Sequence, residues 1–309
     1  MKTTLFITII SVFALGCSEE DNPKTHASGF IILNRYENKA NIDGFEYPSK
    51  NIQNQLFTVA SNTSLHGAAK NGNNIYLHTN YPGKLRKIDL ENQTQIVEVD
   101  SWFENFPFID FNEAEIVVCH LGYDNNGIIK VYNQNLDLQD SIAIPNVMNI
   151  YDAVVSNNKL FFSATILEEG TFIQVMDLSS LTITSSIELE SNSCLFSRLE
   201  DKHLLVIERN RYYMLDATTL EVSNVIPSTF GHTVSRGNFD FSKSENSLYA
   251  LTAAAQPAPV AYVLKKINLA TGETLTLTDF SVNVNGPMVY DNDNKVIICG
   301  VGSDGAGLQ

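Results

Sequence analysis

The chain has 309 residues, 44% of them hydrophobic, which is enough for a substantial core in one or two domains. Its 20 lysine and arginine residues face 35 aspartate and glutamate residues, and the net charge of -15 disfavours nucleic acids and anionic membrane surfaces as partners. The charge favours neutral or cationic ligands. The four cysteines include no Cys-x-x-Cys pair, so the sequence predicts no metal site of the zinc type.

The N-terminus predicts a lipoprotein leader. Lys2 is followed by an apolar run from Leu5 to Leu15, which has the length of a signal-peptide core and is too short to span a bilayer comfortably. The run ends in Ala14-Leu15-Gly16-Cys17, which resembles a bacterial lipobox. We expect residues 1–16 to be a signal peptide and Cys17 to carry a lipid, so that contact with the membrane is through the anchor only. The alternative is an ordinary signal peptide with an incidental cysteine.

An acidic tether follows the predicted lipid. Ser18-Glu19-Glu20-Asp21 is similar to the surface-export signal of Bacteroidota lipoproteins, which implies display on the outer face of the outer membrane. The alternative is a plain solvated tether. In either case residues 17–28 are expected to link the lipid to the folded domain, 29–309.

A repeat of about 44 residues organises that domain. Within it, residues 157–189 are predicted to form three strands with two turns, because short apolar and β-branched runs alternate with polar breaks. The first apolar residue of one such strand recurs at steps of 45, 41, 44, 44, 44 and 48 residues. These anchors are Phe30, Ile75, Ile116, Leu160, Leu204, Leu248 and Val296.

A second marker with the same period is a turn that begins with Asp or Asn. It occurs at Asp89-Leu90, Asn133-Gln134, Asp177-Leu178, Asp216-Ala217 and Asn268-Leu269. Two markers with one period of 40–50 residues indicate propeller blades, since a single four-stranded sheet cannot bury both of its faces alone. The alternative is a β-sandwich, which does not require an even period.

The predicted fold class is therefore all-β, a β-propeller that is most simply seven-bladed with an incomplete last blade. Five repeats are complete, at about 65–100, 108–143, 150–189, 195–226 and 238–280. The first blade begins at Phe30 and is expected to lack an opening strand, because the tether precedes it. The chain stops soon after the strand that begins at Val296, which suggests truncation of the last blade.

A resemblance to a known group adds to this interpretation. The stretch from Gly29 to Tyr36, with Leu65-His66-Gly67-Ala68-Ala69 and the segment 73–77, is similar to the opening of the YncE-like (DUF5074-type) surface propeller lipoproteins of Bacteroidota. Members of that group sit beside outer-membrane transporters and some capture corrinoids such as cobalamin. The resemblance implies a binding module that hands a corrinoid, or another cofactor or metal chelate, to a TonB-dependent transporter.

Candidate ligand-binding residues lie in loops, where propellers usually bind ligands. Trp102 and Phe103 belong to the densest aromatic loop and predict a stacking platform, or alternatively packing between blades. Two corresponding loops each pair a histidine with a tyrosine, and their imidazoles are candidates to reach a metal centre, or alternatively are hydrogen-bonded at strand ends. These pairs are His78 with Tyr81 and His120 with Tyr123.

His232 and Arg236 lie in a long connection, where Arg236 is a candidate to grip a carboxylate or phosphate and the alternative is a solvated loop. The Asp- and Asn-rich stretches 124–127 and 291–294 lack EF-hand spacing and are predicted to be turns. Cys119 and Cys299, which occupy the same strand position in different blades, are expected to be small packing residues, and Cys194 stands alone near the start of another blade.

No Gly-x-Ser-x-Gly, His-Glu-x-x-His or Gly-rich phosphate loop occurs, and no cofactor is predicted. We therefore expect a small-molecule binding module. Two alternatives stay open: a scaffold for protein–protein interaction at the surface, and an enzyme of the lactonase or dehydrogenase type built from residues of several blades.

Overall fold

The structure is a computed structural model that describes residues 8–13, 29–36, 39–46, 51–61, 64–80, 83–101, 107–200, 202–227, 239–253, 262–280, 288–291 and 296–299. Within these ranges the chain is almost entirely strand, and its helical part is one short 3-10 turn, η1 (Tyr123–Asn125). The chain divides into two compact units, Leu65–Thr229 and the remainder, Met1–Ser64 with Phe230–Gln309.

The unit from Leu65 to Thr229 contains four sheets of four strands, which we call sheets B to E. Sheet B is β5 (Ser64–Asn71), β6 (Asn74–Asn80), β7 (Lys84–Asp89) and β8 (Thr94–Asp100). Sheet C is β9 (Phe108–Phe111), β10 (Glu115–Leu121), β11 (Gly127–Asn133) and β12 (Leu138–Ile144). Sheet D is β13 (Val147–Ser156), β14 (Lys159–Ile166), β15 (Gly170–Asp177) and β16 (Thr182–Glu188). Sheet E is β17 (Cys194–Glu200), β18 (His203–Glu208), β19 (Arg211–Asp216) and β20 (Val222–Pro227).

The other unit contains sheets A, F and G. Sheet A is β1 (Thr8–Phe13), β2 (Gly29–Tyr36), β3 (Lys39–Glu46) and β4 (Asn51–Ser61). Sheet F is β21 (Phe239–Ser242), β22 (Ser247–Ala253), β23 (Tyr262–Asn268) and β24 (Thr274–Phe280). Sheet G is β25 (Met288–Asp291) paired with β26 (Val296–Cys299).

Every sheet is a meander in which strands that follow one another in sequence pair with each other. Each of the seven anchors lies in the second strand of its sheet, so the period read from the sequence marks one structural position. In the described residues six sheets have four strands and sheet G has two. The fold class is confirmed: the chain is all-β with the sheet architecture of a β-propeller.

One expectation about sheet A is wrong. The sheet does not begin at Phe30 without an opening strand, because β1 pairs antiparallel with β2 and places Phe13 opposite Ile31. The run Thr8–Phe13 belongs to the segment expected to be the leader, and its β-branched residues suit a strand as well as a signal-peptide core. Removal of residues 1–16 at Cys17 stays a prediction.

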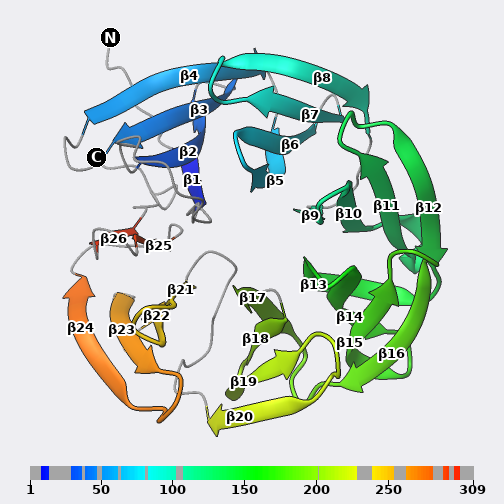
Figure 1. Cartoon of the computed structure of the whole chain (residues 1–309), viewed down its shortest axis with the longest axis vertical. Coiled ribbons are helices and arrows are strands. Elements are labelled where there is room, and N and C mark those ends of the chain that lie inside the picture. The colour runs from blue at the N-terminus through cyan, green and yellow to red at the C-terminus, as the bar shows by residue number, and fades with distance from the viewer. Residues whose placement is uncertain are drawn as a thin grey trace. The chain divides into compact units, whose positions relative to one another are not determined.

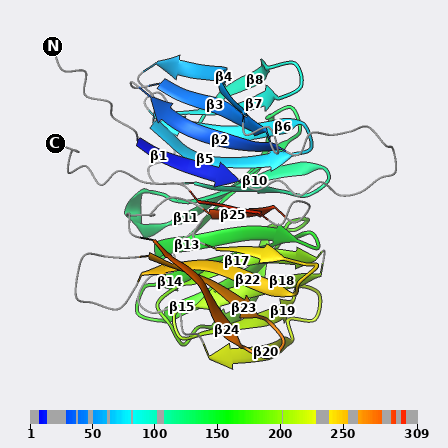
Figure 2. The same cartoon turned by 90° about the vertical axis from the view of Figure 1, so that its left-hand side faces the viewer.

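Burial falls from the second strand of a sheet to the fourth. Second strands such as β14 are continuous apolar runs covered on both faces, whereas β16 reads Thr-Ile-Thr-Ser-Ser-Ile-Glu and is largely exposed. Figure 1 shows why in the Leu65–Thr229 unit: β9, β13 and β17 lie on the inner side of the array of sheets, and β12, β16 and β20 lie on its outer side. Strands β13 and β17 run side by side (Figure 2).

The core of this unit lies in layers between neighbouring sheets. One layer joins sheets B and C through residues such as Tyr76 and Ile116, a second joins C and D around Phe162, and a third joins D and E around Phe161 and Tyr213. Cys119 and Cys194 are buried free thiols in these layers, which confirms the packing role expected for Cys119. Burial raises the pKa of both thiols and keeps them protonated.

The connections in this unit fall at two ends. The turn end carries the links from first to second and from third to fourth strand: residues 72–73, 90–93, 112–114, 134–137, 157–158, 178–181, 201–202 and 217–221. The loop end carries the links from second to third strand and from one sheet to the next: residues 81–83, 101–107, 122–126, 145–146, 167–169, 189–193 and 209–210.

The turn end is closed by its own side chains. The predicted Asp or Asn at the start of each third-to-fourth turn accepts backbone N–H groups from a few residues on: Asp89, Asn133, Asp177, Asp216 and, in sheet F, Asn268. The next residue often bonds across to the first-to-second turn, as Leu178 N–H does to Asn158 O at 3.1 Å. The turns predicted from the sequence are thus confirmed, and their side-chain caps explain the choice of Asp and Asn.

Candidate functional site

The loop end is the candidate functional end, because its connections vary more in length than those of the turn end. The shortest of these connections include residues 145–146 and the longest is residues 101–107, while the turn end repeats the same capped turns. A rigid scaffold with variable loops on one side is the usual arrangement for a binding site. Two polar groups of residues support this end in sheets B and C.

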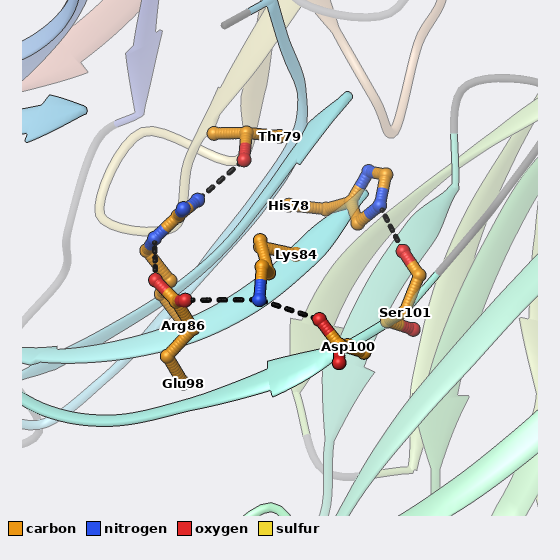
Figure 3. A network of polar contacts seen from close by, with 7 residues as sticks. All are labelled: His78, Thr79, Lys84, Arg86, Glu98, Asp100 and Ser101. Carbon is orange, nitrogen blue, oxygen red and sulfur yellow. Dashed lines mark hydrogen bonds and ion pairs between the residues drawn. The ribbon is translucent and has the colours of Figure 1, made fainter. Parts of the chain in front are cut away.

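The first is a charged cluster at the loop end of sheet B (Figure 3). Arg86, which is 2% exposed, donates from Nε to Glu98 Oε2 at 2.7 Å and from Nη1 to the Thr79 hydroxyl. The Nζ of Lys84 lies 3.2 Å from Glu98 Oε1 and 2.5 Å from Asp100 Oδ1. Strand register explains the cluster, since Lys84 pairs with Asp100 and Arg86 with Glu98 across β7 and β8.

The cluster neutralises itself. Burial favours the protonated form of Glu98, but the hydrogen bond from Lys84 and the charge of Arg86 outweigh it and hold the pKa of Glu98 below its usual value. The hydrogen bonds to Asp100 and Glu98 raise the pKa of Lys84. Two cations and two anions are thus matched, so this cluster fixes the strand ends and offers no net charge to a ligand.

The second group links sheet B to sheet C. His78 Nε2 lies 2.9 Å from the carbonyl oxygen of Ser101 (Figure 3). The Ser101 hydroxyl lies 3.2 Å from the hydroxyl of Tyr132 on β11. All three side chains are buried. The start of the aromatic loop at Ser101 is therefore held by a histidine from its own sheet and a tyrosine from the next.

His120 lies at the end of β10 and is buried. Its Nδ1 is 3.1 Å from the carbonyl oxygen of Leu121. The pKa of His120 is lowered to about 4, chiefly by burial. The bond with Leu121 opposes this shift, and the nearby charge of Lys130 adds to it. Burial also lowers the pKa of Lys130. His120 is thus a neutral imidazole at neutral pH.

The two histidines occupy the same layer. His78 shares a face of β6 with Tyr76, and His120 shares a face of β10 with Val118, because side chains alternate along a strand. Tyr76 and Val118 pack in the layer between sheets B and C, so both imidazoles lie at the loop end of that layer. Their burial and their backbone bonds match the alternative of histidines held at strand ends. A binding role for either one stays a prediction.

The remaining predicted site residues are placed only in part. Tyr123 begins η1, and the structure describes its backbone alone. Tyr81, Trp102, Phe103, His232 and Arg236 lie outside the described residues, as does Cys17. The described residues contain no group of three or more His, Cys, Asp or Glu side chains able to hold a metal ion. The same ranges contain no helix with the length and hydropathy needed to cross a bilayer.

Sequence reasoning missed Lys84, Arg86, Glu98 and Asp100. A signal was present: two basic residues at alternate positions precede a capped turn, and two acidic residues at alternate positions follow it. Pairing the strands across the Asp89 turn brings these charges together.

Comparison with known proteins supports the fold alone. No protein family and no curated protein sequence matches the chain. Among solved structures, one chain of the "Crystal Structure of Mitotic Checkpoint Complex", a WD40 propeller, is similar with a TM-score of 0.66 and 9% identity, over 89% of this chain and 84% of that one. The computationally designed Ika8 protein is similar with a TM-score of 0.57 and 13% identity, over 96% of this chain and 80% of that one.

Proposed function

We propose that this protein is a lipid-anchored binding module of the bacterial cell surface, which captures a small molecule at its loop end and delivers it to a TonB-dependent outer-membrane transporter. The ligand class is a corrinoid or another cofactor or metal chelate. The leader, lipobox and acidic tether support the location. The propeller architecture suits a binding module. The sequence contains none of the catalytic motifs considered above, which also favours binding over catalysis.

The observation that carries the proposal is the difference between the two ends of the sheets. The turn end is closed by repeated caps, whereas the strand ends of sheet B at the loop end carry matched charges and buried hydrogen bonds. Trp102 and Phe103 follow in sequence directly after Ser101, whose carbonyl oxygen takes part in one of these bonds. Flat aromatic side chains on a rigid base suit a flat or amphipathic ligand.

The single tryptophan makes ligand binding at this loop testable. Because Trp102 is the only Trp, intrinsic tryptophan fluorescence reports on that loop alone. Soluble protein starting at Ser18 would be titrated with cyanocobalamin, haemin and a ferric siderophore, with N-acetyltryptophanamide as the control for light absorption by the ligand. We expect saturable quenching by one of the three. The variant Trp102→Ala, followed by calorimetry, should weaken binding, while Leu138→Ala on the exposed outer strand β12 should not. Absence of binding to all three would overturn the corrinoid and chelate assignment.

The location has a separate test. Cys17→Ser should abolish incorporation of labelled fatty acid and release the protein from the membrane fraction. Replacement of Glu19, Glu20 and Asp21 by alanine should keep the lipid but protect the protein from protease added to intact cells. Accessibility to protease that does not depend on the acidic residues would contradict their role in surface export.

One observation favours the scaffold alternative. The outer strands carry exposed large apolar side chains: Ile96, Leu138, Ile183, Val222, Val225, Leu275 and Leu277. Most are separated by polar neighbours along their strands, and single exposed apolar residues are common on protein surfaces. Concentration-dependent self-association or capture of a protein partner, lost on replacing Val222 and Val225 by lysine, would favour this second function.

A further inference from the structure

The inner edge of β13 is crossed by side chains from both neighbouring sheets. Strand β13 pairs only with β14 within sheet D, so backbone groups on its other edge have no partner in the sheet. The N–H of Val155 donates instead to Asp110 Oδ2 of β9 at 2.7 Å. The carbonyl oxygen of Val155 accepts from Arg198 Nη2 of β17 at 2.6 Å. A residue of sheet D is therefore bound by sheet C on one side and sheet E on the other.

Arg198 spans this edge. Its Nη2 also donates to Asp110 Oδ2 at 2.8 Å, and its guanidinium carbon lies 6.0 Å from the ring centre of Phe111. One nitrogen thus makes both hydrogen bonds, and within the described residues Nε and Nη1 make none. The side chain is 36% exposed. The guanidinium is held in place while two of its nitrogens remain available to a ligand.

Two other arginines of the same unit provide a contrast. Arg211 donates from Nε to Glu208 at 2.8 Å and from Nη1 to Glu190 at 2.6 Å, so both nitrogens are already on carboxylates. Arg86 is buried and uses Nε and Nη1 on Glu98 and Thr79. Of these three guanidinium groups, Arg198 is the most exposed, and in the part of the chain that the structure describes two of its nitrogens are unused where the other two arginines each have one.

The carboxylate beside Arg198 does not exclude an anion. Asp110 is 17% exposed, and both of its oxygens accept hydrogen bonds: Oδ1 from the N–H of Phe111 at 2.9 Å, and Oδ2 from Val155 and Arg198. Its charge is spread over three donors, whereas Nε and Nη1 of Arg198, on a side chain that is 36% exposed, make no hydrogen bond within the described residues. Planar guanidinium groups bind carboxylate and phosphate oxygens in this way.

We propose that Arg198 forms a binding position for a small oxyanion, a carboxylate or a phosphate, on the inner side of the Leu65–Thr229 unit. Arg198, Val155 and Phe111 all lie near the turn-end limits of their strands. The position is therefore distinct from the loop-end site and goes beyond the proposed function. Phe111 and Asp110 act as positioning residues that hold the guanidinium.

The test follows the arginine side chains directly. The side-chain Nε–H signals of the soluble protein would be recorded by NMR during titration with sodium phosphate, and separately with sodium succinate, against sodium chloride at equal ionic strength. We expect the Arg198 signal to shift and saturate with at least one of the two anions, and the two titrations tell a phosphate site from a carboxylate site. A shift that follows ionic strength alone, equal in chloride, would overturn the proposal.

Variants separate binding from structure. Backbone amide signals near Val155 report on the same anion when the arginine is replaced. Arg198→Gln should abolish their saturation, Arg198→Lys should weaken binding roughly tenfold through loss of one charged hydrogen bond, and Arg211→Gln should leave it within about twofold. Saturation that persists in Arg198→Gln, or an equal loss of binding in Arg211→Gln, would contradict the proposal. The titration contains no corrinoid or chelate, so its failure leaves the loop-end function untouched.

Discussion

His120 shows how burial of one side chain makes the stability of the fold depend on pH. Its pKa in the folded protein is about 4, below the value of about 6.5 for an exposed histidine. Between these values the unfolded chain binds more protons, so stability rises with pH. The contribution is complete above about pH 6.5 and is lost as the pH falls toward 4, by about 3 kcal/mol in all.

Denaturant unfolding of the wild type and His120→Gln, at neutral and acid pH, would measure this effect. The variant should lose less stability on acidification, because the group that resists protonation is gone. Val118→Ala, on the same face of β10, removes buried volume without a titratable group and should lower stability equally at both pH values. Equal acid sensitivity in wild type and His120→Gln would contradict the prediction.

Asp152 is a second buried residue whose role can be measured. It is 1% exposed and lies on β13, where Oδ1 accepts the N–H of Ala153 at 2.9 Å and Oδ2 accepts the N–H of Phe196 on β17 at 2.8 Å. Asp152→Asn would turn an amide N–H₂ toward a backbone donor, and we expect a loss of about 2 kcal/mol in the free energy of unfolding. Asp140→Asn on the exposed strand β12, where Oδ1 likewise accepts the next N–H, should change it by less than about 0.5 kcal/mol.

At the scale of the element, the capped turn is the unit that repeats. Asp177 Oδ1 accepts the N–H of Ser180 at 3.0 Å, and the same position holds Asn133 in sheet C and Asn268 in sheet F. Asp177→Ala should therefore lower stability by about 1 kcal/mol, while Asp177→Asn should keep most of it. Thermal unfolding of the two variants checks the order. An equal loss of stability in the two variants would mean that the cap requires a charged side chain.

The outer strands have a second repeated feature. In the described pairs of third and fourth strands, the register shifts once in each of five sheets, so that the fourth strand carries an extra residue. Such bulges increase the local twist and make an edge strand a poor template for pairing with another chain. They account for exposed apolar residues at the outer edge, such as Ile96 and Leu277, which occur at the shifts in β8 and β24.

How far the sequence predicted these elements depends on the range of the interactions. The anchors and the capped turns were predicted correctly because each depends on a few consecutive residues. Strand β1 was not, since one apolar run satisfies both a leader and a strand. The bond between Arg198 and Asp110 joins residues 88 apart in sequence, and no local pattern marks it. The burial of His78 and His120 depends on which face of a strand meets the next sheet, which the repeat alone does not state.

At the scale of the whole molecule, the two ends should differ in their tolerance of insertion. Doubling the connection 101–107 with a Gly-Ser segment between Asn105 and Phe106 should cost only about 0.6 kcal/mol in loop closure. The same segment between Leu178 and Ser179 would break the cap of Asp177 and the bond from Leu178 to Asn158, each about 1 kcal/mol. Thermal unfolding of both chains would compare them, and equal losses would contradict the distinction between the ends.

The candidate site was predicted less completely than the fold for a related reason. Trp102, Tyr81 and Arg236 were chosen by residue type, and they lie outside the described residues. What the structure adds is a set of charges at the neighbouring strand ends, such as Arg86 and Glu98, that meet only when the strands pair. The residue types in a loop can suggest a class of ligand. The side chains that hold the ends of the loop can be identified only once the pairing of the strands is known.

The capped turns also bear on how such a chain can diversify. Because each cap is completed within a handful of consecutive residues, a stretch of DNA that encodes one repeat carries the means of closing its own hairpin. A duplicated or exchanged repeat would then form its own turn at the turn end. Only its connections at the loop end would have to change to give a new binding specificity.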